Sequence, residues 1–64
     1  SSIVLLAMVQ PEGSISSVQP TRKGERRLEE AAMKEVYLWR FEPLPNSVPQ
    51  VAQLCHVTFL FKLQ

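Results

Sequence analysis

The chain has 64 residues, of which 45% are hydrophobic and 20% are charged, and its formal net charge is +1 at pH 7. This length allows one small domain, because a chain of about 60 residues buries only about 60% of the surface that it exposes when unfolded. The composition is typical of a globular domain rather than of a disordered tail or a strongly basic nucleic-acid binder. One cysteine and one histidine exclude an internal disulfide and a Cys/His zinc cluster. We therefore expect residues 1–64 to form a single domain, without metal or cofactor, whose core depends on packing alone.

The beginning of the chain predicts two strands joined by a turn. The run from Ile3 to Val9 is apolar and rich in β-branched residues, and it is far shorter than the ~20 residues that a membrane-spanning helix needs. Pro11-Glu12-Gly13 follows as a turn, and the polar stretch from Ser14 to Pro20 fits an exposed strand that ends at proline. Together these segments predict a β-hairpin.

An amphipathic helix is expected from Glu25 to about Leu38, where helix formers occur without glycine or proline. Pro43 favours an end near Trp39 or Arg40. At 100° per residue, one face of this helix is apolar; its members are Leu28, Ala31, Ala32, Val36, Leu38 and Trp39. Glu35 falls on the same face, so either it reaches solvent at the helix edge or it pairs with a cation such as Arg40.

After a loop marked by Pro43, Pro45 and Pro49, apolar and polar residues alternate from Cys55 onward. This period of two is typical of a half-buried strand. The order strand, strand, helix, strand predicts an α+β fold, a two-layer sandwich in which one helix covers one face of a three-stranded antiparallel sheet. Because the first strand is apolar on both faces, it is expected at the centre of the sheet, in the strand order 2-1-3.

This arrangement predicts a core and an apolar outer face of the sheet. The expected core residues are Leu5, Leu28, Ala32, Val36, Trp39, Phe41, Phe59 and Phe61. If Ile3, Leu5, Ala7 and Val9 face the helix, the intervening residues of the same strand face away from it. An exposed apolar cluster of this kind usually marks an interface. We predict that a second copy, or upstream residues, covers the outer face of Val4, Leu6, Met8 and Leu60.

No set of residues in the chain supports catalysis or nucleic-acid binding. The stretch Gly24–Val36 has the first spacing of a Nudix box, but the later carboxylates of that motif are missing. Cys55 and His56 are adjacent in a predicted strand, so their side chains point to opposite faces and cannot form a nucleophile–base pair. Glu25 interrupts the basic cluster between Arg22 and Arg27, and Glu29 and Glu30 follow it. No aromatic residues lie within the cluster to stack on bases. We expect a domain that is not an enzyme and binds no nucleic acid.

Four features, in order, resemble the C-terminal domain of the TonB family of energy transducers. They are Val9-Gln10-Pro11-Glu12-Gly13 at the hairpin turn, Gly24 before the helix, Leu28-Glu29-Glu30-Ala31-Ala32 followed by Trp39-Arg40-Phe41-Glu42-Pro43, and Val57–Leu63 as the closing strand. The resemblance covers nearly the whole chain, and the junction from the helix to Trp39-Arg40-Phe41 is its most specific part.

The resemblance implies a non-enzymatic periplasmic domain, a fragment of a longer protein anchored in the inner membrane of a Gram-negative bacterium. Members of the family couple an ExbB–ExbD proton-motive complex, contacted through upstream regions, to outer-membrane receptors that import siderophore-bound iron or other nutrients. The short Ton box of such a receptor adds as a strand beside the closing strand of the domain, which is β-augmentation. In this chain the receiving residues would be Cys55, His56, Val57, Thr58, Phe59, Leu60, Phe61 and Lys62. A TolA-like adaptor for envelope integrity and a structural dimerisation module remain as alternatives.

Overall fold

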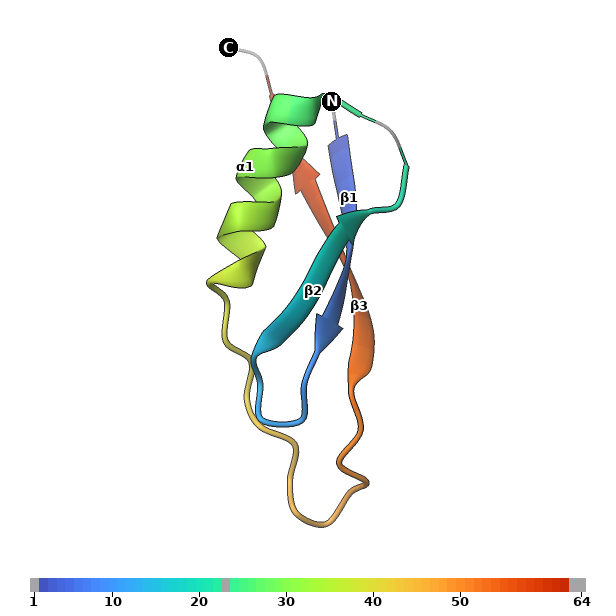
Figure 1. Ribbon diagram of the computed structural model, residues 1–64, viewed down its shortest axis with the longest axis vertical. Coiled ribbons are helices and arrows are strands. Elements are labelled where there is room, and N and C mark those ends of the chain that lie inside the picture. The colour runs from blue at the N-terminus through green and yellow to red at the C-terminus, as the bar shows by residue number, and fades with distance from the viewer. Residues whose placement is uncertain (1, 23, 63–64) are drawn as a thin grey trace.

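The computed structural model describes residues 2–22 and 24–62. Strands β1 (Ser2–Val9) and β2 (Ile15–Pro20), helix α1 (Arg26–Tyr37) and strand β3 (Gln53–Leu60) follow one another along the chain. The strands form one antiparallel sheet in the order β2-β1-β3, with α1 against one side of it (Figure 1). The predicted α+β fold and strand order are confirmed. Lys23 of the basic cluster and Leu63 of the closing strand lie outside the described residues.

The core lies between α1 and the inner face of the sheet. Its buried members are Ile3, Leu5, Ala7, Val18, Ala32 and Val36. Leu5 and Val36 are completely buried, each with 0% of its surface exposed. Among the other expected core residues, Leu28, Trp39, Phe59 and Phe61 are partly buried and pack against this cluster. Phe41 does not belong to the core, because it is 38% exposed and is not among the residues packed against the core cluster.

The apolar stripe of α1 is narrower than the periodicity predicts. Ala31 is exposed and Leu38 is 75% exposed, although both were expected to face the sheet. The helix packs mainly on β2 and β1, so only the stripe that contains Ala32 and Val36 is fully covered. Glu35 is exposed as well, which favours the solvent alternative for this residue.

The end of α1 is closed by a tighter final turn. The N–H groups of Leu38 and Trp39 donate to the carbonyl oxygens of Glu35 and Val36, at 3.1 and 3.0 Å, three residues back along the chain. Bonds of this spacing are typical of the last turn of a helix. The guanidinium of Arg40 donates to the carbonyl oxygen of Trp39 at 2.9 Å, so its hydrogen bonds go to the helix end rather than to Glu35.

Candidate functional site

The pairing of β1 with its two neighbours decides which backbone groups of β3 face away from the sheet. In antiparallel strands, successive residues direct their N–H and C=O groups alternately to one side and to the other. Val4 directs its carbonyl oxygen to the β2 side, where it accepts a bond from the Thr21 N–H at 3.0 Å. Even-numbered residues of β1 therefore bond with β2, and odd-numbered residues bond with β3.

Because of this alternation in β1, every second residue of β3 directs its backbone N–H and C=O groups away from the sheet. Leu5 is opposite Val57 and Ala7 is opposite Cys55, so the odd-numbered residues of β3 use their N–H and C=O groups on β1. The even-numbered residues direct theirs the other way, and β3 is the last strand of the sheet. We call these outward groups the open edge; they belong to Leu54, His56, Thr58 and Leu60.

The open edge is regular along its whole length. The register between β1 and β3 runs without a shift from Gln53 to Leu60, and β3 contains no proline. Proline and β-bulges are the usual devices that stop an edge strand from pairing with another chain. Within β3 neither device is present, so its backbone is compatible with an additional strand.

Side chains of β3 alternate between the two faces of the sheet. Cys55, Val57 and Phe59 are half-buried on the helix side, whereas His56 and Thr58 are exposed on the other side. Of the predicted receiving residues, Cys55 to Leu60 lie in β3, while Phe61 and Lys62 follow its end. Sequence reasoning missed Leu54 as part of this edge. Its apolar side chain stands at a position where the alternation predicts a polar residue, so the receiving residues were counted only from Cys55, although regular structure was expected to resume near Gln53, where β3 begins.

Aromatic rings support β3 from the helix side. The ring of Trp39 lies 5.9 Å from that of Phe59, and the ring of Phe59 stacks on that of Phe61 at 6.3 Å, measured between centroids. Phe41 meets Trp39 edge to face at 6.5 Å. Because α1 packs mainly on the other two strands, Trp39 is the residue that connects the end of the helix to β3.

Trp39→Ala should therefore lower the free energy of unfolding by about 2 kcal/mol, a loss below the range for fully buried aromatic residues because Trp39 is only half-buried. Phe41→Ala removes a ring that is more exposed than that of Trp39, so it should lower the free energy of unfolding by about 1 kcal/mol or less. Urea unfolding of both variants, followed by circular dichroism, checks the difference. Equal losses would contradict the role given to Trp39.

The hairpin turn and the segment after α1 are joined by backbone hydrogen bonds. The N–H of Phe41 donates to the carbonyl oxygen of Gly13 at 2.9 Å, and the N–H of Leu44 donates to that of Pro11 at 2.8 Å. Gly13 itself has φ +102°, a conformation that residues with a Cβ rarely adopt. Two of the four motifs that carry the family resemblance are thus in direct contact. Figure 1 shows this segment passing beside the hairpin turn before the chain enters β3.

Glu12 in the same turn is held by Ser14. The Ser14 hydroxyl donates to Oε1 of Glu12 at 2.6 Å, and the Ser14 backbone N–H donates to the same oxygen at 3.3 Å. These bonds favour the charged carboxylate, so they hold the pKa of Glu12 below its usual value. A carboxyl whose pKa is lowered by folding stabilises the fold above its unfolded-state pKa, and this contribution is lost as the pH falls through the folded-state value.

Ser14→Ala removes the hydroxyl donor, so the pKa of Glu12 should rise toward its usual value. An NMR titration of the Glu12 side-chain carboxyl carbon measures this change. Ser16→Ala is the matched control, since the Ser16 hydroxyl bonds to Gln10 and Met8 instead. An equal pKa shift in the two variants would show that Ser14 is not the cause.

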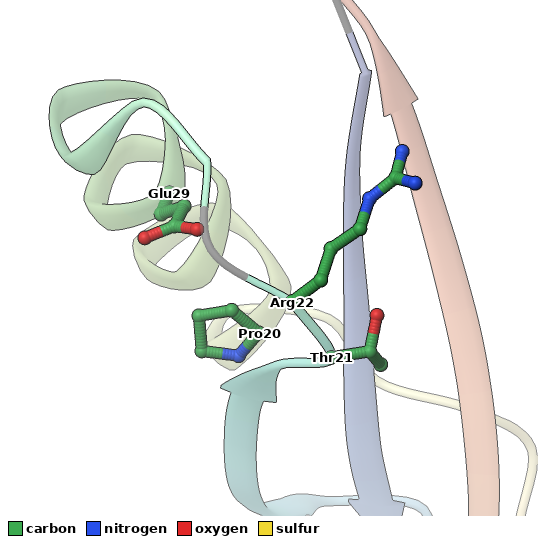
Figure 2. Close-up of a pocket in the computed structure, with 4 residues that line it drawn as sticks. All are labelled: Pro20, Thr21, Arg22 and Glu29. Carbon is green, nitrogen blue, oxygen red and sulfur yellow. The ribbon is translucent and has the colours of Figure 1, made fainter.

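A hollow of about 320 Å³ at the end of β2 is a weaker candidate for a site. It is lined by Pro20, Thr21, Arg22 and Glu29. Figure 2 shows the guanidinium of Arg22 extending along β1, away from the Glu29 carboxylate, and Arg22 donates to the Ser2 hydroxyl at 3.3 Å. The cation and the carboxylate therefore do not converge on one ligand position.

Among residues 2–22 and 24–62, no three His, Cys, Asp or Glu side chains come together in a way that could hold a metal ion. In the same part of the chain, no helix has the length and apolarity needed to cross a membrane. The most regular feature available to a partner is the backbone of the open edge.

One helix on a three-stranded sheet with an open edge defines a small α+β domain of the protein-interaction class. The profile of the family described as "Gram-negative bacterial TonB protein C-terminal" matches residues 1–63, and the chain belongs to this family. The predicted resemblance is thus confirmed. The family consists of non-enzymatic protein-interaction domains of the Gram-negative periplasm. Comparison with curated proteins and with solved structures found no match.

Proposed function

We propose that the domain receives the Ton box of an outer-membrane receptor as an added strand at β3. The observation that carries this proposal is the open edge, whose backbone groups at His56, Thr58 and Leu60 repeat every second residue along a strand without bulge or proline. An extended peptide needs this backbone pattern in order to pair with a sheet. Membership of the TonB C-terminal family supports an outer-membrane receptor as the partner.

In this function the domain transmits force and performs no chemistry. Energy from the proton-motive complex of ExbB and ExbD would reach the domain through an inner-membrane anchor and upstream regions. When the added strand pairs along the whole of β3, a pulling force on it is shared by all hydrogen bonds between the two strands. The aromatic contacts of Trp39 with Phe59 support the receiving strand from behind. The receptor's cargo would be siderophore-bound iron or another nutrient.

The test is a titration of the isotope-labelled domain with a Ton-box peptide, followed by amide shifts and hydrogen exchange. The amides of His56, Thr58 and Leu60 should gain protection, because these N–H groups face the open edge. Cys55 and Val57 should already be protected without peptide, since they bond to β1. A peptide of the same length with proline at alternate positions is the control, because it cannot pair. Shifts centred elsewhere, without new protection at the open edge, would refute the proposal.

The outer face of the sheet favours a homodimer as a second role. Val4, Leu6 and Met8 are half-buried there, and Leu60 is 73% exposed. Leu54, at 62% exposed, extends the same apolar face along β3. Two copies packed face to face would remove this surface from water.

Leu60→Lys places a charge on this face and should shift the protein toward the monomer by at least about tenfold in dissociation constant. Sedimentation velocity across a range of concentrations measures this change. Lys62→Ala is the control, since Lys62 lies beyond the end of β3. A wild-type domain that stays monomeric at all concentrations would eliminate the dimer.

A further inference from the structure

A three-stranded sheet has two edges, and in this domain the edge of β2 differs from the open edge of β3. The odd-numbered residues of β1 bond with β3, so Val18, which is opposite Ala7, directs its N–H away from the sheet. In the structure this N–H donates to the hydroxyl of Tyr37 at 3.2 Å. The outward donor at the middle of β2 is therefore already in use.

Tyr37 reaches Val18 from the last turn of α1. Figure 1 shows α1 beside β2, and the two elements are in contact. The side chain of Tyr37 is 44% exposed, so it is not a core residue, and its ring crosses to the strand at the surface of the molecule. The backbone of Tyr37 is also hydrogen-bonded, since its carbonyl oxygen accepts a hydrogen bond from the Arg40 guanidinium at 3.3 Å.

The neighbouring positions of β2 offer no substitute donor for an incoming strand. The next outward residue is Pro20, which has no N–H group, and the following residue, Thr21, turns its N–H to Val4 of β1. On the other side of Val18, the register of β2 against β1 shifts near Ser16. A proline and a bulge are two recognised ways of protecting a sheet edge, and Tyr37 is a third.

We propose that Tyr37 closes the β2 edge, so that the domain takes up a partner strand at β3 alone. Uptake of a partner strand at β3 rests on the proposed function, whereas closure of β2 rests on the hydrogen bond between Val18 and Tyr37. Closure makes each domain accept one strand and prevents two domains from pairing through their β2 edges. Tyr37 thereby acts as a specificity-determining residue, although it contacts no partner itself.

Hydrogen exchange of Tyr37→Phe in the whole domain tests the closure directly. This substitution removes the hydroxyl and keeps the ring, so the fold is retained. The Val18 amide should exchange about fivefold faster or more, while the amides of Ser17 and Gln19, which face β1, should change by less than about twofold. An unchanged rate at Val18 would overturn the proposal. An equal increase at all three amides would also overturn it, because it would indicate general destabilisation.

A double variant, Tyr37→Ala with Pro20→Val, tests whether closure limits strand uptake. It restores outward donors at positions 18 and 20, so the number of Ton-box peptides bound per domain should rise from one to two, with new protection at Val18. Pro20→Val alone retains the Tyr37 hydroxyl and should still bind one. A double variant that binds one peptide and leaves Val18 unprotected would overturn the proposal. If wild-type β3 bound no peptide, the proposed function would fail while the exchange result at Val18 would still decide the role of Tyr37.

Discussion

Gly13→Ala should destabilise the fold by about 2–5 kcal/mol. The φ of +102° at Gly13 costs a residue with a Cβ about 1–2 kcal/mol. The added Cβ would also overlap the carbonyl oxygen of Phe41, and forcing extra atoms into a packed site costs about 1–3 kcal/mol. Relief would require the Phe41 segment to move, which would break its hydrogen bond to Gly13. A domain of this size has only about 3–5 kcal/mol of stability, so the variant should lose most of it and should unfold at a much lower urea concentration than the wild type, as followed by circular dichroism.

Gly24→Ala is the matched control for this prediction. Gly24 does not have a positive φ, and the nearest atoms to an added Cβ are Oε2 of the flexible Glu29 side chain at 3.1 Å and Cδ1 of Ile3 at 3.2 Å. The Glu29 carboxylate can move aside, and the core residue Ile3 has to give by only a few tenths of an ångström, so the loss should stay below about 1 kcal/mol. If Gly13→Ala unfolded at the same urea concentration as Gly24→Ala, the turn would not be docked on Phe41.

The second large effect is expected on binding rather than on stability. Thr58→Pro should weaken binding of a Ton-box peptide by at least about tenfold, because it removes an outward N–H and places a ring where the added strand would lie. The fold should persist, since proline is tolerated on an edge strand where the N–H faces solvent. Isothermal titration calorimetry gives the dissociation constant, and the amide spectrum reports whether the sheet is intact.

Two further variants separate the backbone effect from other causes. Thr58→Val alters the same side chain but keeps the N–H, so its dissociation constant should stay within about threefold of the wild type. Val57→Pro removes a donor to Leu5 in the middle of the ladder and should disrupt the sheet. If Thr58→Pro bound the peptide as tightly as the wild type, the partner would not use the open edge.

These predictions connect two of the family motifs, the hairpin turn and the junction after α1, to the proposed site. Phe41 bonds to the hairpin turn, and the preceding Trp39 packs on Phe59. The turn therefore holds the start of the connection to β3, while the indole supports the strand itself. Substitutions in the turn or at Trp39 should thus impair binding through the position of β3, without contacting the partner.

Local patterns in the sequence were sufficient for the order of elements and much of the architecture. The alternation from Cys55 onward predicted β3, and the apolar run of Ile3 to Val9 predicted a central strand, because a strand that is apolar on both faces fits the middle of a sheet better than its edge. The helix was likewise predicted from the spacing of apolar residues within its own segment. Much of the candidate site, from Cys55 to Leu60, followed from the same alternation and from the family resemblance.

Tertiary structure alone decided which groups of that strand are available. Side-chain alternation shows which residues face the helix, but the direction of each N–H depends on pairing with β1, some fifty residues away in the chain. The exposure of Phe41 and Leu38 depends likewise on how far α1 extends over the sheet. The bond from Val18 to Tyr37 joins two elements that no sequence period relates. Periodicity reports the environment of side chains along one element, whereas an open or closed edge is a property of backbone groups in neighbouring elements.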